Sequence, residues 1–140
     1  MASDATALIV EPVILGRAAM GETPEAVQFR DSWRLRRDGQ LAHAEATRIT
    51  PPLAALRQGA AGLGDNRAFA TMIYLGPDAA DRLEALRTAL APLPLRAAAS
   101  AWHGKLAVRL AAPGGQALRA ALLALIPLFR STPLPRVWTM

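Results

Sequence analysis

The sequence predicts an α+β fold, in which a mostly antiparallel β-sheet carries two amphipathic helices. Three observations support this prediction. Apolar runs of strand length recur along the chain, two pairs of them have the form of β-hairpins, and two further segments carry leucines at helical spacing. We expect residues 1–140 to form a single domain, because a chain of this length can bury about two thirds of its unfolded surface.

The first part of the chain predicts a strand followed by a hairpin. Residues 7–15 form an apolar run that is typical of a buried strand. Residues 25–49 read as a hairpin, because Asp38-Gly39 favours the positive backbone angles of a tight reversal. After Pro51-Pro52, residues 53–63 have only weak helical character, because they contain glycines.

The first arm of this hairpin alternates in character. Phe29, Trp33 and Leu35 are expected on one packed face together with Asp31. Arg30, Arg34 and Arg36 are expected on the other, solvated face. This alternation indicates a sheet with one packed face and one wet, cationic face.

The second part of the chain predicts the order strand, helix, strand, strand, helix. The strands are expected at 68–75, 95–102 and 105–111, and the last two are joined by the turn His103-Gly104. This order is typical of helices that lie on one face of an antiparallel sheet.

The two helices of this part have recognisable limits. The first is expected from Asp78 to about Leu90. The second opens with Pro113-Gly114-Gly115, and Pro127 should kink or end it, because proline removes a backbone hydrogen bond. The tail, residues 133–140, is expected to be extended.

Composition excludes several classes of function. Cysteine is absent, which excludes disulfides, thiolate metal sites and a cysteine nucleophile. The first residues lack the positive flank of a signal peptide, and the uncharged stretch 120–129 is too short to span a bilayer. We therefore expect a cytoplasmic protein without a membrane partner, and the net charge of +5 favours anionic partners only weakly.

A tight turn follows the first strand, in residues 16–22. Gly16 and Gly21 have the spacing of a phosphate-binding loop, but Glu22 stands at the lysine position and would repel the anion. The turn should bring Arg17 close to Glu22. The two side chains form either an ion pair that fixes the turn or a polar lining for an ion route or a partner contact.

The arginines of the hairpin also allow two interpretations. Arginines that are interleaved with an aromatic side chain can bind nucleic acid. However, strand alternation places Trp33 on the face opposite Arg30, Arg34 and Arg36. An acidic protein partner is therefore the favoured interpretation, and no nucleic acid is expected.

Neither a metal site nor a catalytic site can be recognised. His43 and His103 are far apart in the sequence, and neither has a second ligand at metal-binding spacing. Ser100 lacks the flanking glycines of a nucleophile elbow. We therefore predict that the protein is not an enzyme.

Four segments resemble one known family, the urease accessory proteins called UreD or UreH. The segments are Gly16-Arg17-Ala18-Ala19-Met20-Gly21-Glu22, Asp31 to Leu41 followed by Glu45 and Arg48, Ser100 to Leu106 followed by Arg109, and Leu134-Pro135-Arg136-Val137-Trp138. Their order and spacing match across almost the whole chain. Family members are longer, and this chain is similar only to their C-terminal half.

The resemblance implies a scaffold in the complex that delivers nickel to the urease apoprotein. The implied partners are the urease apoprotein, UreF, and UreG through UreF. Nickel would be a transient cargo, and no tightly bound cofactor is implied. The implied fold is elongated and mostly β with two helices, and a tunnel through it is proposed to carry the metal. The candidates for conduit or partner contact are Arg17, Glu22, Arg34, Arg36 and Glu45.

One alternative function stays open at this point. The order of elements in the second half and the cationic hairpin would also suit a stand-alone α+β module that binds a small ligand or a nucleic acid. If the chain is half of a longer family member, sheet edges that the other half would pair are expected to be open and to favour association with another chain.

Overall fold

The computed structural model describes residues 1–2, 4–16, 26–58 and 62–138. The chain divides into two compact units. The hairpin unit comprises Met1–Ala5 and Leu15–Asp65, and the sheet unit comprises Thr6–Ile14 and Asn66–Met140. Together they confirm the predicted α+β class with mostly antiparallel strands.

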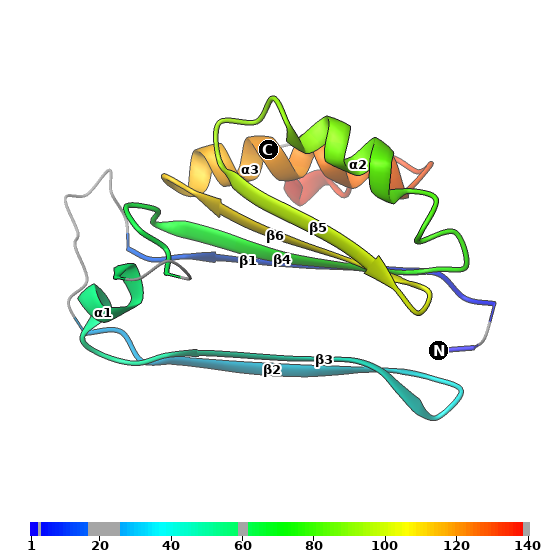
Figure 1. The fold of residues 1–140 in the computed structure, drawn as a ribbon, viewed down its shortest axis with the longest axis horizontal. Helices are drawn as coiled ribbons and strands as arrows, with labels where there is room; N and C mark the ends of the chain where they lie inside the picture. Colours follow the sequence, from blue (N-terminus) through cyan, green and yellow to red (C-terminus); the bar gives the residue numbers. More distant parts are fainter. Residues whose placement is uncertain (3, 17–25, 59–61, 139–140) are drawn as a thin grey trace. The chain divides into compact units, whose positions relative to one another are not determined.

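The sheet unit is built on four antiparallel strands, which Figure 1 shows with two helices on one face. In spatial order they are β1 (Ala7–Ile14), β4 (Ala68–Leu75), β6 (Lys105–Ala112) and β5 (Arg96–Trp102). The turn His103-Gly104 has φ angles of 49° and 68°, the left-handed values that a two-residue hairpin turn requires. The second predicted hairpin is therefore confirmed.

Helices α2 (Leu83–Leu90) and α3 (Gly115–Leu125) cover one face of this sheet. Helix α2 contacts β5, and α3 contacts β4 and β6. Leucines at helical spacing, among them Leu86, Leu118 and Leu122, are almost fully buried against alternate residues of the strands. Burial of this apolar surface holds the sheet unit together.

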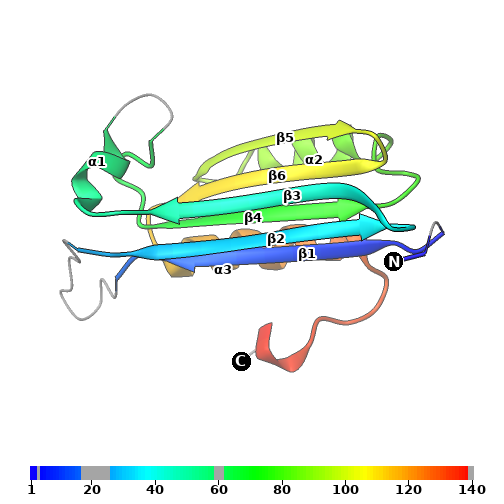
Figure 2. The same ribbon diagram turned by 90° about the horizontal axis from the view of Figure 1, so that it is seen from below.

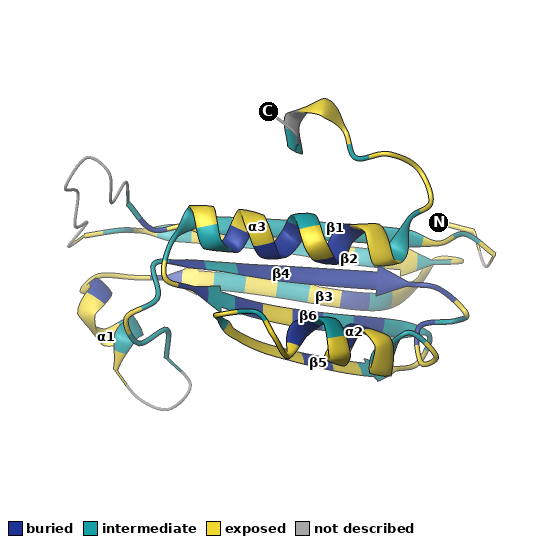
Figure 3. Cartoon of the chain, turned by 90° about the horizontal axis from the view of Figure 1, so that it is seen from above, coloured by how far each residue is buried: buried dark blue, intermediate teal, exposed yellow. Residues whose placement is uncertain are grey.

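Strand β4 lies inside the sheet and is buried along nearly its whole length, as Figure 3 shows. Met72 and Tyr74 belong to the core beneath the helices, whereas Ile73 and Leu75 point to the opposite face and are also buried. The sequence Ala68–Leu75 is apolar except for Thr71, which is the pattern expected of a strand whose residues are buried on both faces.

The hairpin unit contains the first predicted hairpin (Figure 2). Strands β2 (Phe29–Arg37) and β3 (Gln40–Ile49) are antiparallel, and the short helix α1 (Leu53–Arg57) follows them. Asp38 and Gly39 at the turn have φ angles of 49° and 77°, as the Asp-Gly sequence predicts.

Two predicted boundaries are wrong. The first amphipathic helix begins at Leu83 rather than at Asp78, because the carboxylate of Asp78 binds Tyr74 and Arg82 instead of capping a helix. The tail is not wholly extended, because a short 3₁₀ helix forms at Arg136–Trp138. The predicted effect of Pro127 is confirmed: α3 ends at Leu125, and a 3₁₀ helix, Ile126–Phe129, continues from it.

The part of the chain that the structure describes contains no helix that is long and apolar enough to cross a membrane.

Candidate functional site

Three of the five predicted site residues lie on the β2–β3 hairpin. Arg34 and Arg36 belong to β2, and Glu45 belongs to β3. Arg17 and Glu22 lie outside the described residues, so their predicted proximity stays a prediction.

One face of the hairpin is exposed and cationic, and we call it the arginine face. Every residue of β2 on this face is exposed, as the alternating burial pattern of the strand shows. The face consists of Arg30, Ser32, Arg34 and Arg36 from β2 and Leu41, Ala44, Ala46 and Arg48 from β3. It contains four arginines and no acidic residue, so it favours anionic partners.

Glu45 lies on the opposite face of the hairpin and is therefore not brought together with Arg34 and Arg36. Its Oε2 atom is 3.3 Å from Nε2 of His43. The two side chains are 12% and 8% exposed, so this pair is largely shielded from solvent. The Trp33 ring packs beside the His43 ring, with 5.7 Å between the ring centroids.

A β-bulge determines which residues of β3 share the arginine face. Leu35 pairs with His43, whereas Arg36 pairs with Leu41, so Ala42 is the extra residue of the bulge. An extra residue reverses the alternation of side chains beyond it. The bulge therefore places Leu41, which is 52% exposed, on the arginine face beside Arg36.

The sheet unit contains a polar cluster that the sequence did not reveal. The Tyr74 hydroxyl donates to Oδ1 of Asp78 at 2.6 Å, and Nε of Arg82 donates to Oδ2 at 2.7 Å. Arg82 also donates to the carbonyl oxygen of Leu128, at 2.6 Å, and lies over the rings of Tyr74 and Phe129. The cluster thus connects the end of β4 to the 3₁₀ helix Ile126–Phe129, which follows α3 in the chain.

These contacts shift the pKa values of the three ionisable groups. Hydrogen bonds from Arg82 and then Tyr74 hold the pKa of Asp78 below its ordinary 3.8. Burial and the hydrogen bond to Asp78 raise the pKa of Tyr74 above 10.0. Asp78 also raises the pKa of Arg82. At neutral pH, Asp78 and Arg82 are therefore charged and Tyr74 is neutral, which are the states that these hydrogen bonds require. This marks the cluster as structural.

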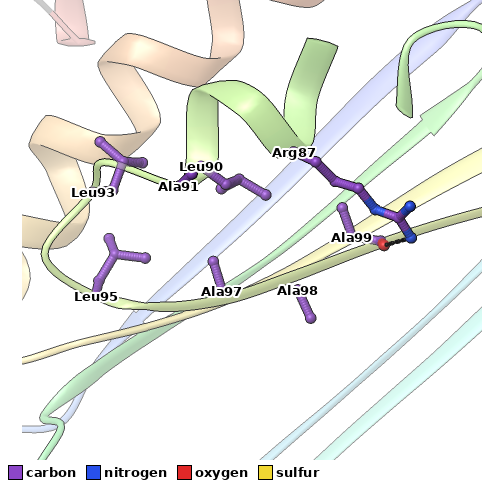
Figure 4. Close-up of a pocket in the computed structure, with 8 residues that line it drawn as sticks. All are labelled: Arg87, Leu90, Ala91, Leu93, Leu95, Ala97, Ala98 and Ala99. Carbon is purple, nitrogen blue, oxygen red and sulfur yellow. Dashed lines mark hydrogen bonds between the residues drawn. The ribbon is translucent and has the colours of Figure 1, made fainter. Parts of the chain in front are cut away.

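A pocket of about 430 Å³ lies between α2 and β5. Figure 4 shows Leu90, Leu93 and Leu95 around it, with Arg87 at one side. The guanidinium of Arg87 donates to the carbonyl oxygen of Ala99 at 3.2 Å and to Oε1 of Glu84 at 2.9 Å. The lining is aliphatic except for Arg87, and it holds no acid–base pair.

A second, smaller pocket of about 260 Å³ lies between β1 and α3. Pro12 and Ile14 of β1 line it together with Leu118 and Leu122 of α3. Trp138 of the tail segment also lines it, and the carbonyl oxygen of Trp138 accepts a hydrogen bond from Arg119.

Among the described residues, no group of three or more His, Asp or Glu side chains could hold a metal ion. The pair His43 and Glu45 offers one imidazole and one carboxylate. His103 is exposed in the β5–β6 turn, in the other unit.

The family model described as UreD urease accessory protein matches residues 1–139. A urease accessory protein UreD of Xanthobacter autotrophicus is 44% identical over 138 residues, which cover 99% of this chain and 48% of the relative. A urease accessory protein UreD of Rhizobium johnstonii is 48% identical over 136 residues, which cover 95% of this chain and 48% of the relative. A urease accessory protein UreD 2 of Methylorubrum populi is 44% identical over 140 residues, which cover 99% of this chain and 47% of the relative.

Proposed function

Because this chain belongs to the UreD urease accessory protein family, we propose that it acts as an accessory protein in urease maturation and not as an enzyme. The observation that carries this proposal is the family match over residues 1–139. The chain spans about half the length of the curated relatives that it matches. The role proposed for it is therefore the contribution of that part to the complex, and the expected cytoplasmic location belongs to the same proposal.

The proposed role is that of a scaffold with the urease apoprotein, with UreF, and with UreG through UreF. The arginine face supports a contact with a protein partner, because four exposed arginines lie on one side of a short hairpin. Arg34 and Arg36 are the proposed contact residues at the turn end of this face.

Nickel is the proposed cargo of the complex. Imidazole and carboxylate groups are ligands that divalent first-row metals accept, and a transfer route needs weak, successive ligands. His43 and Glu45 supply one of each, 3.3 Å apart. We therefore propose Glu45, with His43, as a transient contact for the ion, and Arg17 and Glu22 keep their proposed role in the route or in a partner contact.

The family match disfavours the alternative of a stand-alone binding module. The hairpin geometry also disfavours nucleic acid, because the only aromatic side chains of β2, Phe29 and Trp33, lie on the face opposite the arginines.

Activation of urease in a cell that lacks its own UreD tests the proposal. The chain is supplied joined to the part of the Xanthobacter autotrophicus relative that it does not match. We expect urease activity and the nickel content of the purified urease to rise, and UreF and urease to co-purify with the fusion. A fusion that accumulates in folded form but neither activates urease nor retains UreF or urease would contradict the proposal.

Two variants separate the proposed contacts. Glu45→Gln should lower the nickel content of urease without preventing co-purification, because it removes a carboxylate ligand but no surface charge of the arginine face. Arg34→Glu with Arg36→Glu should instead act mainly by reducing the amount of UreF and urease that co-purifies. Arg130→Glu with Arg136→Glu, an equal change of charge in the sheet unit, is the control.

A further inference from the structure

The arginine face carries positive charge that the described residues do not neutralise. Arg30 and Arg48 stand directly opposite each other in the register of β2 and β3. Like charges in this position destabilise a sheet. Among the described residues, no carboxylate forms an ion pair with Arg30, Arg34 or Arg48. An anionic partner would relieve this repulsion.

The charges are distributed at the two ends of the face. Arg30 and Arg48 lie at the end far from the turn, and Arg34 and Arg36 lie nearer to it. A strand rises about 3.4 Å per residue, so Arg30 and Arg34 are separated by about 14 Å along the hairpin. Ser32 and its register partner Ala46 lie between them, and Ala44 lies opposite Arg34. These three side chains are small, so a partner backbone can approach closely here.

An apolar side chain completes the surface at the turn end. The bulge at Ala42 places Leu41 beside Arg36, where it is 52% exposed. Interfaces between proteins combine apolar anchors with a charged rim, whereas a phosphate backbone offers no apolar group for such a side chain. No aromatic residue lies on this face, so it also lacks the platform on which bases stack.

We propose that the arginine face docks an acidic protein segment that carries carboxylates about 14 Å apart, with small residues between them and an apolar side chain against Leu41. Arg30 and Arg48 bind one carboxylate group, and Arg34 and Arg36 bind the other. This inference deepens the proposed function, because it gives the chemistry of one partner contact. Its test measures binding to the isolated protein and does not involve urease. Binding can therefore fail while urease activation succeeds, and urease activation can fail while binding succeeds.

The probe is a fluorescent peptide with two Glu pairs and then a leucine. A run of three small residues separates the pairs, so that the inner Glu of each pair are four residues, or about 14 Å, apart when the peptide is extended. We expect binding at low salt that weakens as ionic strength rises. Arg30→Gln, Arg34→Gln and Arg48→Gln together should weaken binding about tenfold or more. Leu41→Ser should weaken it about threefold without changing its salt dependence.

A matched variant controls for total charge. Arg57→Gln, Arg130→Gln and Arg136→Gln also remove three charges, all of them outside the arginine face, and should leave binding within about twofold. If this variant weakens binding as much as the first, bulk charge is responsible and the proposal is wrong. Absence of binding at low salt would also overturn it.

Two further measurements complete the test. A single-stranded RNA of equal charge should bind more weakly than the peptide, and tighter RNA binding that depends on the same arginines would replace the proposal by a nucleic-acid contact. If the arginine variant does not fold, amide shifts of the unmodified protein decide the question. Addition of the peptide should shift Ser32, Ala44 and Ala46, and shifts confined to other residues would contradict the proposal.

Discussion

At the scale of single residues, Asp78 joins three parts of the sheet unit. Its carboxylate accepts hydrogen bonds from Tyr74 of β4 and from Arg82, which in turn donates to the backbone at Leu128. Both members of the ion pair are partly open to solvent, at 40% for Asp78 and 34% for Arg82, so screening limits its contribution.

Asp78→Asn should destabilise the protein by about 1 kcal/mol at neutral pH, because a charge-assisted hydrogen bond becomes a neutral one in a partly solvated site. The folded-state pKa of Asp78 lies below the ordinary 3.8. Its stabilisation is therefore complete above pH 3.8 and is lost as the pH falls through the folded-state pKa. Urea unfolding across acid pH should show a shallower loss of stability in the variant.

The control for this prediction is Glu84→Gln, which removes the ion pair with Arg87, whose members are 81% and 51% exposed. Its effect on the free energy of unfolding should be only a few tenths of a kcal/mol. An acid slope that is equal in the wild type and in Asp78→Asn would show that Asp78 does not carry this stabilisation.

Gly76 gives a second test at this scale. A Cβ atom on Gly76 would lie 2.6 Å from Cζ of Tyr74, inside the contact distance of carbon atoms. Gly76→Ala should therefore displace the Tyr74 ring and cost about 1–3 kcal/mol, measured by thermal unfolding. Gly114→Ala, where a Cβ would meet nothing within 4 Å, should cost under about 1 kcal/mol. Equal losses would argue against the clash.

At the scale of elements, a side chain occupies part of the free hydrogen-bonding edge of the outer strand β5. The two-residue turn makes Trp102 and Lys105 a hydrogen-bonded pair, so by alternation the carbonyl of Ala99 points away from β6. Arg87 of α2 donates to this carbonyl at 3.2 Å. A side chain that occupies an edge carbonyl hinders another strand from pairing there.

Arg87→Gln should therefore increase association through β5. A hydrogen bond of this kind is worth about 1 kcal/mol, so the association constant should rise about fivefold. Sedimentation velocity over a series of concentrations measures it. Glu84→Gln, which leaves the bond between Arg87 and Ala99 in place, is the matched control, and an equal rise in both variants would contradict the role of Arg87.

The elements also show what the sequence can and cannot predict. Asp38-Gly39 and the alternation from Phe29 to Leu35 predicted the first hairpin and its arginine face, because turn and pattern are local properties. The start of α2 was mispredicted because Asp78 is held by tertiary partners. The bulge at Ala42 could not be seen, because simple alternation assigns Leu41 to the opposite face.

The candidate site was predicted only in part for the same reason. The alternation of the strand predicts the positions of Arg34 and Arg36. The contact between Glu45 and His43 is not predicted, because a histidine and a glutamate two residues apart on a strand form no recognisable motif. The family was predicted correctly, since four ordered segments carry it.

At the scale of the whole molecule, the open strands predict self-association. Among the described residues, β1 pairs only with β4, and β5 pairs only with β6. We expect the chain on its own to associate as its concentration rises, because unpaired edges accept further strands. Light scattering checks this, and a monodisperse monomer over the whole concentration range would contradict it.

Salt dependence identifies which surface is responsible. Association through strand edges relies on backbone hydrogen bonds and should persist at high salt, whereas contacts of the arginine face are screened. If association disappears at high salt, it arises from charge and not from open edges.

The extra residue at Ala42 has one more consequence. If Ala42 were removed, plain alternation from His43 would still place Leu41 opposite Arg36, on the side of the arginines. Loss of the extra residue should therefore leave the outer surface of the hairpin intact. Loss of the neighbouring Leu41 would shorten the chain equally but would remove the apolar side chain of that surface.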